Sequence, residues 1–150
     1  MKKILEKLPR GIRNCNPLNI RRTPTSSWKG MRDEQSDKSF CQFKHMKYGF
    51  RAAFFLLKLY YAQHKLRTIR QLINRWAPSS DNNNTEAYIA SVCKDCHLTS
   101  DQPLPYLTDD PQTWFDIVAA MVDVECGETA EYLDKDLILG FILAVKDEVK

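Results

Sequence analysis

One carboxylate in the sequence has the position that a general acid requires. Glu125 ends an expected helix, and three apolar residues precede it on the same face at helical steps: Trp114, Val118 and Met121. Burial on that face and the negative end of the helix dipole both raise the pKa of a carboxyl group. A carboxyl that stays protonated can protonate the leaving oxygen of a glycosidic bond. The alternative is a glutamate whose side chain turns into solvent. Helix position alone favours this alternative.

A cysteine and histidine cluster is the second candidate for chemistry. The run from Cys93 to His97 reads CKDCH, which matches the pattern of c-type haem attachment and could supply three zinc ligands. Haem attachment requires export, and we expect no export signal here. No partner motif accompanies the cluster, and cysteines on a helix often serve as small core residues. We therefore predict no metal site and no cofactor.

A basic and aromatic segment near the N-terminus could bind a polymer. Five cationic residues surround Trp28: Arg10, Arg13, Arg21, Arg22 and Lys29. Arginine and tryptophan can bind nucleic acid, and they can equally bind sugars through ring stacking and hydrogen bonds to hydroxyls. The net charge of +3 is small and no known nucleic-acid module is visible. We predict no nucleic-acid partner.

Composition sets wider bounds on the molecule. The chain has 150 residues, 43% of them hydrophobic and 27% charged, which predicts one folded domain over residues 1–150. Five cysteines make an odd number, so we expect no disulfide framework and a reducing compartment. The longest nearly apolar stretch, around residues 52–57, is too short to span a bilayer, and we predict no membrane partner.

An ordered series of motifs resembles a family of phage-type peptidoglycan-degrading proteins. The opening run RGIRNCNPLNIR, which starts at Arg10, resembles the family's RGIRNNNPxNIR. Trp28-Lys29-Gly30 resembles its W-x-G, and the stretch ending in Arg75-Trp76-Ala77-Pro78 resembles its R-W-A-P block. Glu125-Cys126-Gly127 resembles its late E-N-G. The similarity extends from Arg10 to about Ala144.

The resemblance implies both a fold and a substrate. The implied fold is lysozyme-like and α+β, mainly α, with a small irregular β-region near the N-terminus packed against a helical bundle. The implied substrate is bacterial peptidoglycan. The N-terminal run is also similar to the β-region of cell-wall glucosaminidases, which lines a sugar groove and follows a helix that ends in a catalytic glutamate. Here Glu6 alone precedes that region.

The implied site follows from the same motifs. Glu125 would be the catalytic acid, and four residues would bind the glycan: Asn19, Trp28, Tyr48 and Trp76. The chain departs from the family pattern at two positions, where Cys15 and Cys126 replace asparagine.

Two functions are consistent with these motifs. The first is glycan-strand cleavage by a muramidase or lytic transglycosylase. A transglycosylase needs a single acid, whereas an inverting hydrolase needs a second carboxylate, for which Asp81 and Glu34 are candidates. The second is a non-catalytic phage structural or glycan-binding protein on the same fold, with other phage particle proteins as partners. We expect a protein made in the cytoplasm without a signal peptide that reaches the cell wall through a phage particle or by lysis.

These residues require elements to position them. Short strands are expected at residues 18–22, 28–30 and 40–43, where apolar and polar residues alternate or turns flank the run. Apolar spacing predicts a helix from Met46 and a second one after the cap Thr68. Further helices are expected over residues 85–96, 113–125 and 134–149, and Gly127 is the expected C-terminal cap of the helix over 113–125.

Overall fold

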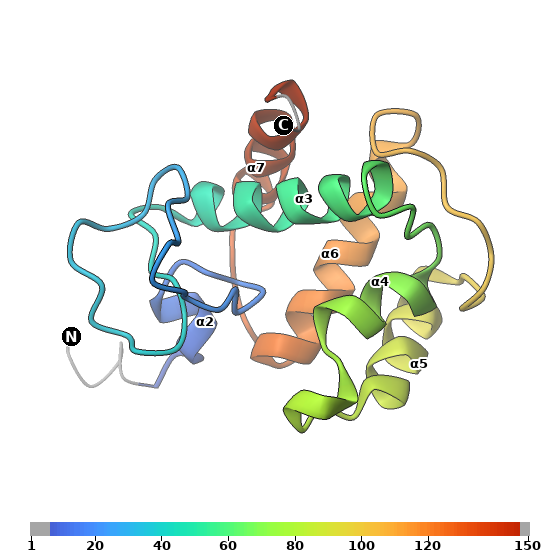
Figure 1. Ribbon diagram of the computed structural model, residues 1–150, viewed down its shortest axis with the longest axis horizontal. Helices are drawn as coiled ribbons and strands as arrows, with labels where there is room; N and C mark the ends of the chain where they lie inside the picture. The colour runs from blue at the N-terminus through green and yellow to red at the C-terminus, as the bar shows by residue number, and fades with distance from the viewer. Residues whose placement is uncertain (1–6, 148–150) are drawn as a thin grey trace.

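The regular elements of the chain are all helices in the computed structural model, which describes residues 7–147 (Figure 1). In chain order they are α2 (Arg10–Arg13), α3 (Met46–Ala62), α4 (Ile69–Trp76), the short 3₁₀ helix η1 (Ser79–Asp81), α5 (Thr85–Cys96), α6 (Pro111–Cys126) and α7 (Asp134–Lys146). Glu6, and Val149 at the expected end of the last helix, lie outside the described residues.

The predicted α+β fold is wrong, because residues 7–147 contain no strand and no sheet. A few backbone hydrogen bonds and two isolated antiparallel bridges connect the three segments expected to be strands: Arg21 bridges Phe40, and Met31, one residue beyond the expected 28–30 strand, bridges Phe43. The segment between α2 and α3 is therefore an irregular loop region, which lies to the left in Figure 1. The described part of the chain is all-helical, and the expected lysozyme-like β-region is absent from it.

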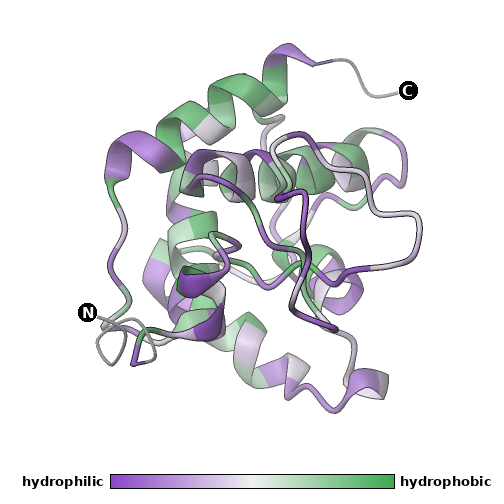
Figure 2. Ribbon diagram, turned by 90° about the vertical axis from the view of Figure 1, so that its left-hand side faces the viewer, coloured by the Kyte–Doolittle hydropathy of each residue, from purple (hydrophilic) through white to green (hydrophobic). Residues whose placement is uncertain are grey.

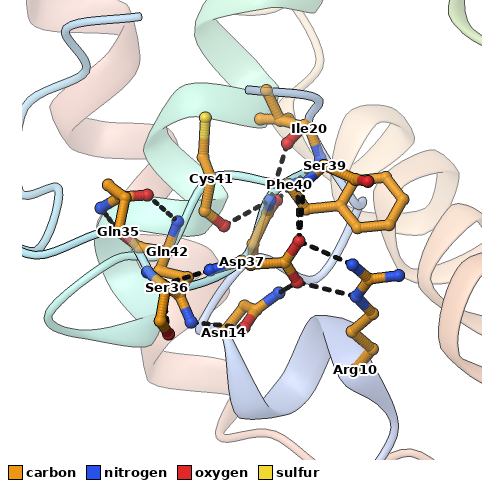
Figure 3. Close-up of polar contacts among 11 residues, drawn as sticks. Arg10, Asn14, Ile20, Gln35, Ser36, Asp37, Ser39, Phe40, Cys41 and Gln42 are labelled. Atoms are coloured by element: carbon orange, nitrogen blue, oxygen red, sulfur yellow. Dashed lines mark hydrogen bonds and ion pairs between the residues drawn. The ribbon is translucent and has the colours of Figure 1, made fainter. Parts of the chain in front are cut away.

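Side-chain amides take the place of a β-ladder in this segment (Figure 3). The fully buried Asn16 accepts a hydrogen bond from the Ile20 amide at 2.9 Å and donates to the carbonyl oxygens of Ile20 and Cys41. The Gln35 side-chain amide donates to the backbone carbonyl of Gln42 and accepts from its backbone N–H, both at 2.8 Å. Backbone groups that are satisfied in this way need no neighbouring strand.

Asp37 ties this segment to α2. Its carboxylate accepts hydrogen bonds from the Arg10 guanidinium at 2.6 and 2.7 Å and from the Asn14 amide at 2.9 Å. The backbone N–H groups of Ser39 and Phe40 also donate to it. The Arg10 guanidinium holds the pKa of Asp37 well below its usual range. Figure 3 shows these groups converging on the one carboxylate.

The predicted helix from Met46 is confirmed and forms the centre of the molecule. The apolar side chains that define its inner face are all buried: Phe50, Ala53, Phe54, Leu57 and Tyr61. Its most extensive helix contact is with α7, which lies against it at the top of Figure 1. These two helices are far apart in the sequence, so they form the core only after the chain returns on itself.

The end of α7 is fixed by two cations of α3. Lys58, only 3% exposed, donates to the backbone carbonyl of Ala144 at 2.7 Å and to that of Asp147. Arg51 pairs with the Asp147 carboxylate at 2.6 Å. The opposite side of this last helix keeps apolar residues in solvent, and Figure 2 shows its hydrophobic middle. These exposed residues are Leu133, Ile138, Leu139 and Ile142.

The other predicted helices are also confirmed. Thr68 caps α4 by accepting from the Gln71 amide at 3.2 Å, and α5 has the predicted bounds. α6 begins two residues earlier than predicted because Asp110 supplies the cap ahead of Pro111. Gly127 ends that helix with a φ of 93°. Among the described residues, no helix is both long and apolar enough to cross a membrane.

Candidate active site

A cleft of about 690 Å³ lies between the N-terminal segment and α4, with α3 and the end of α6 completing its lining. The N-terminal segment contributes residues 18–21, Thr23, residues 25–28 and Phe40; α3 contributes Leu56 and Tyr60; α4 and the loop after it contribute residues 75–78, Asp81 and Asn83; α6 contributes Glu125. In Figure 1, the N-terminal segment and α4 lie on opposite sides of α6. The cleft therefore joins parts of the chain that are distant in sequence.

Glu125 reaches the cleft from the last turn of α6. Glu125 lies on the apolar face of the helix, as predicted, and Trp114, Val118 and Met121 on that face are fully buried. The Tyr88 hydroxyl donates to Oε2 at 3.0 Å, and the Asn19 amide donates to Oε1 at 3.2 Å. Both carboxylate oxygens are thus held in place, which fixes the direction in which the group points.

Burial raises the pKa of Glu125 above its ordinary value. The hydrogen bonds from Asn19 and Tyr88 oppose this rise because they favour the charged form. The Trp76 indole and the charge of Arg21 act in the same direction as these donors. Desolvation is the largest of these effects, so the carboxyl holds its proton to higher pH than an exposed glutamate does.

Asn19 occupies its place through an unusual backbone conformation. Its φ of 52° lies in the left-handed region, which asparagine adopts more readily than most residues. Its Oδ1 is buried and accepts no hydrogen bond from the described part of the chain. Gly11 of α2 allows the close approach, since a methyl group there would come 2.9 Å from that oxygen and 2.7 Å from Sγ of Cys126.

Aromatic rings cover both walls of the cleft. Trp28 stands on the N-terminal wall and packs edge-on against Phe55, with ring centroids 6.0 Å apart. Trp76 stands on the α4 wall and packs edge-on against Tyr60 at 6.3 Å. Sugar rings stack on such faces, and the bracing rings behind them keep the faces in position.

Tyr48, a predicted glycan-binding residue, does not line the cleft. Its ring packs on the turn at Gly30, where φ is 81° and a methyl group would come 2.2 Å from Cγ of Tyr48. The tyrosine therefore supports the loop that carries Trp28. The structure brings Asn19, Trp28 and Trp76 together with Glu125 and leaves Tyr48 outside.

Sequence reasoning missed Tyr88 as a site residue. Tyr88 lies on the buried side of α5 and is only 5% exposed. A buried tyrosine hydroxyl needs a hydrogen-bond partner, and that need is the signal that could have identified it. Of the two candidates for a second carboxylate, Asp81 lines the cleft, whereas Glu34 is exposed elsewhere.

Four cysteines lie in surroundings that disfavour thiolates: Cys41, Cys93, Cys96 and Cys126. Burial raises the pKa of Cys96 to about 12 and that of Cys126 to about 11. Cys126 donates to the carbonyl of Pro17 at 3.3 Å, beside the site. Within residues 7–147 no group of three metal-binding side chains converges.

Sequence comparison connects the chain to a virus. No protein-family model matches it. It is 33% identical over 137 residues to Protein P5 of Pseudoalteromonas phage PM2, a match that covers 88% of this chain and 82% of that protein. The match supports the predicted phage connection. The chain belongs to the family of this phage protein P5.

Proposed function

We propose that this protein cleaves the glycan strands of bacterial peptidoglycan, as a muramidase or lytic transglycosylase, with Glu125 as the general acid. The observation that carries the proposal is the placement of a desolvated carboxyl in a cleft with tryptophan on both walls. The similarity to a phage protein fits an activity directed at a bacterial wall. The proposed reaction uses side chains alone and needs no cofactor.

The first step is proton transfer from Glu125 to the glycosidic oxygen. The bond between that oxygen and the anomeric carbon breaks, and the sugar acquires positive charge as Glu125 becomes a carboxylate. Tyr88 and Asn19 already donate to the two carboxylate oxygens. Their hydrogen bonds strengthen as the negative charge develops, so they stabilise the transition state more than the ground state.

The second step decides between the two reaction types. In a transglycosylase, a hydroxyl of the same sugar attacks the anomeric carbon and returns its proton to the Glu125 carboxylate. In an inverting hydrolase, a second carboxylate activates water, and Asp81 is the candidate in the cleft lining. The products differ by one water, so mass spectrometry of the released fragments assigns the reaction.

The test is the clearing of purified cell walls, followed as loss of turbidity. Wild type should clear the walls, and Glu125→Gln should reduce the rate by about 100-fold or more, the scale of general acid catalysis. Glu128→Gln is the matched control, because Glu128 is exposed and outside the cleft lining, and it should clear like wild type.

Two results would contradict the proposal. Equal clearing by Glu125→Gln would remove Glu125 as the acid. A folded wild type that sediments with walls of several types without clearing them would indicate the glycan-binding alternative instead.

A further inference from the structure

Two arginines in the cleft form no ion pair with a carboxylate of the described chain, although the charge of Arg21 acts on Glu125 from a longer distance. Arg21 enters from the N-terminal segment and Arg75 from α4, so the two come from different walls. Neither forms an ion pair within residues 7–147, whereas Arg10, Arg51 and Arg70 each pair with a carboxylate. Their charges are therefore available to a molecule that occupies the cleft.

Each of these guanidinium groups lies against an aromatic ring of the cleft. Arg21 is 5.6 Å from the ring centroid of Phe40, and Arg75 is 5.0 Å from that of Tyr60. Contact with a ring face limits the motion of a long side chain and leaves its N–H donors free. A preoriented guanidinium loses less entropy when it binds a carboxylate in bidentate fashion.

The acids of the cleft do not neutralise both arginines. Glu125 and Asp81 also line it, and burial keeps Glu125 protonated to higher pH than usual. When Glu125 holds its proton, the described lining carries two positive charges and the single negative charge of Asp81. Such a cleft favours an acidic polymer over a neutral one.

We propose that Arg21 and Arg75 form a carboxylate-binding subsite, which makes the cleft selective for glycans that bear carboxylate groups over neutral glycans. The proposal rests on the proposed function, because it names the substrate class of the same cleft. The carboxylates could belong to the sugar's own lactyl substituent or to an attached peptide. Both have the chemistry that a guanidinium recognises.

The test measures binding in a form that cannot turn over its ligand. Glu125→Gln is titrated by calorimetry with three ligands: a peptide-free muramyl glycan fragment with free lactyl carboxylates, the same fragment with these groups converted to carboxamides, and a peptide-bearing fragment. We expect the acidic peptide-free fragment to bind about tenfold tighter than its carboxamide, with a preference that weakens as salt rises.

Variants of the two arginines then assign the preference. Arg21→Gln with Arg75→Gln should abolish it, and Arg21→Lys with Arg75→Lys should restore part of it. Arg13→Gln should keep it in full, because Arg13 is exposed and outside the cleft lining. Thermal unfolding confirms that each variant is folded.

The outcomes separate this inference from the proposed function. A preference confined to the peptide-bearing fragment and lost in the glutamine pair would support the subsite and assign it to peptide carboxylates. Equal binding of all three fragments would overturn the subsite and leave glycan recognition intact. A folded protein that binds none of the three fragments would contradict the proposed function as well.

Discussion

The hydroxyl of Tyr88 in α5 donates a hydrogen bond to the carboxylate of Glu125 in α6, with 3.0 Å between the two oxygens. Burial raises the pKa of Tyr88 well above its ordinary value, so the hydroxyl keeps its proton, and can donate, to higher pH than an exposed tyrosine. The bond joins two packed helices behind the cleft, whose lining includes Glu125. It also makes Tyr88 a positioning residue for the proposed acid.

Replacing Tyr88 with phenylalanine should move the pH profile of wall clearing. The variant loses a donor to the charged form, so the pKa of Glu125 rises further. A general acid works while protonated, and activity falls as the pH rises through its pKa. The alkaline limb of the profile should therefore shift to higher pH, while the maximal rate falls about tenfold because the developing carboxylate is less stabilised.

A second tyrosine supplies the control for that experiment. Tyr106 lies outside the cleft lining and packs against Tyr61. Tyr106→Phe should leave the pH profile unchanged. If Tyr88→Phe lowered the rate equally at all pH values, Tyr88 would act through packing rather than through the titration of Glu125.

Two substitutions of Asn19 separate the effect of its backbone conformation from the effect of its side-chain amide. Both Asn19→Gly and Asn19→Ala remove the donor to Glu125, so both should slow clearing to a similar extent. Only alanine is strained at a φ of 52°. The alanine variant should therefore be less stable than the glycine variant by about 1 kcal/mol in urea unfolding. Equal stabilities would show that the left-handed conformation is not retained.

Cys15→Asn should stabilise the protein. Cys15 has a φ of 51°, and asparagine tolerates this region better than cysteine does. The expected gain is about 0.5–1 kcal/mol in the free energy of unfolding. Cys93→Asn is the comparison, since Cys93 lies within the right-handed helix α5 and should gain nothing. A loss of stability in Cys15→Asn would mean that contacts of the thiol outweigh the backbone strain.

Lys58→Met should destabilise the protein through the end of α7. The ammonium group serves the carbonyls of Ala144 and Asp147, which become unsatisfied when it is removed. The expected cost is about 1–3 kcal/mol in the free energy of unfolding. Lys135→Met removes an exposed lysine of α7, and the free energy of unfolding should stay within about 0.5 kcal/mol of wild type. Similar losses in both variants would contradict the capping role.

The helices were predicted correctly from the sequence, whereas the strands were predicted wrongly, and the difference has a physical reason. Apolar residues repeated over several helical turns, as in α3, leave little choice of structure. Alternation of apolar and polar residues over only four positions, as from Phe40 to Phe43, is compatible with several local structures. There the local outcome depended on whether the side chains of Asn16 and Gln35 would satisfy backbone groups that a neighbouring strand would otherwise pair.

The candidate site was likewise predictable only where it depends on local spacing. Helical spacing placed Glu125 correctly on the apolar face of α6, because that relation is local. The partnership of Glu125 with Tyr88 and Asn19 crosses the whole chain, and nothing in local spacing encodes it. Tyr48 was misplaced because an aromatic residue that supports a turn looks the same in sequence as one that faces a sugar.

The pairing of α3 with α7 has a consequence for how the protein is made. The inner face of α3 is synthesised about seventy residues before the helix that covers it, so the nascent chain carries an uncovered apolar surface through most of translation. Closing so long a loop is entropically costly and slows folding. We therefore expect commitment to the native state to come late, when Lys58 and Arg51 can engage the residues around Asp147.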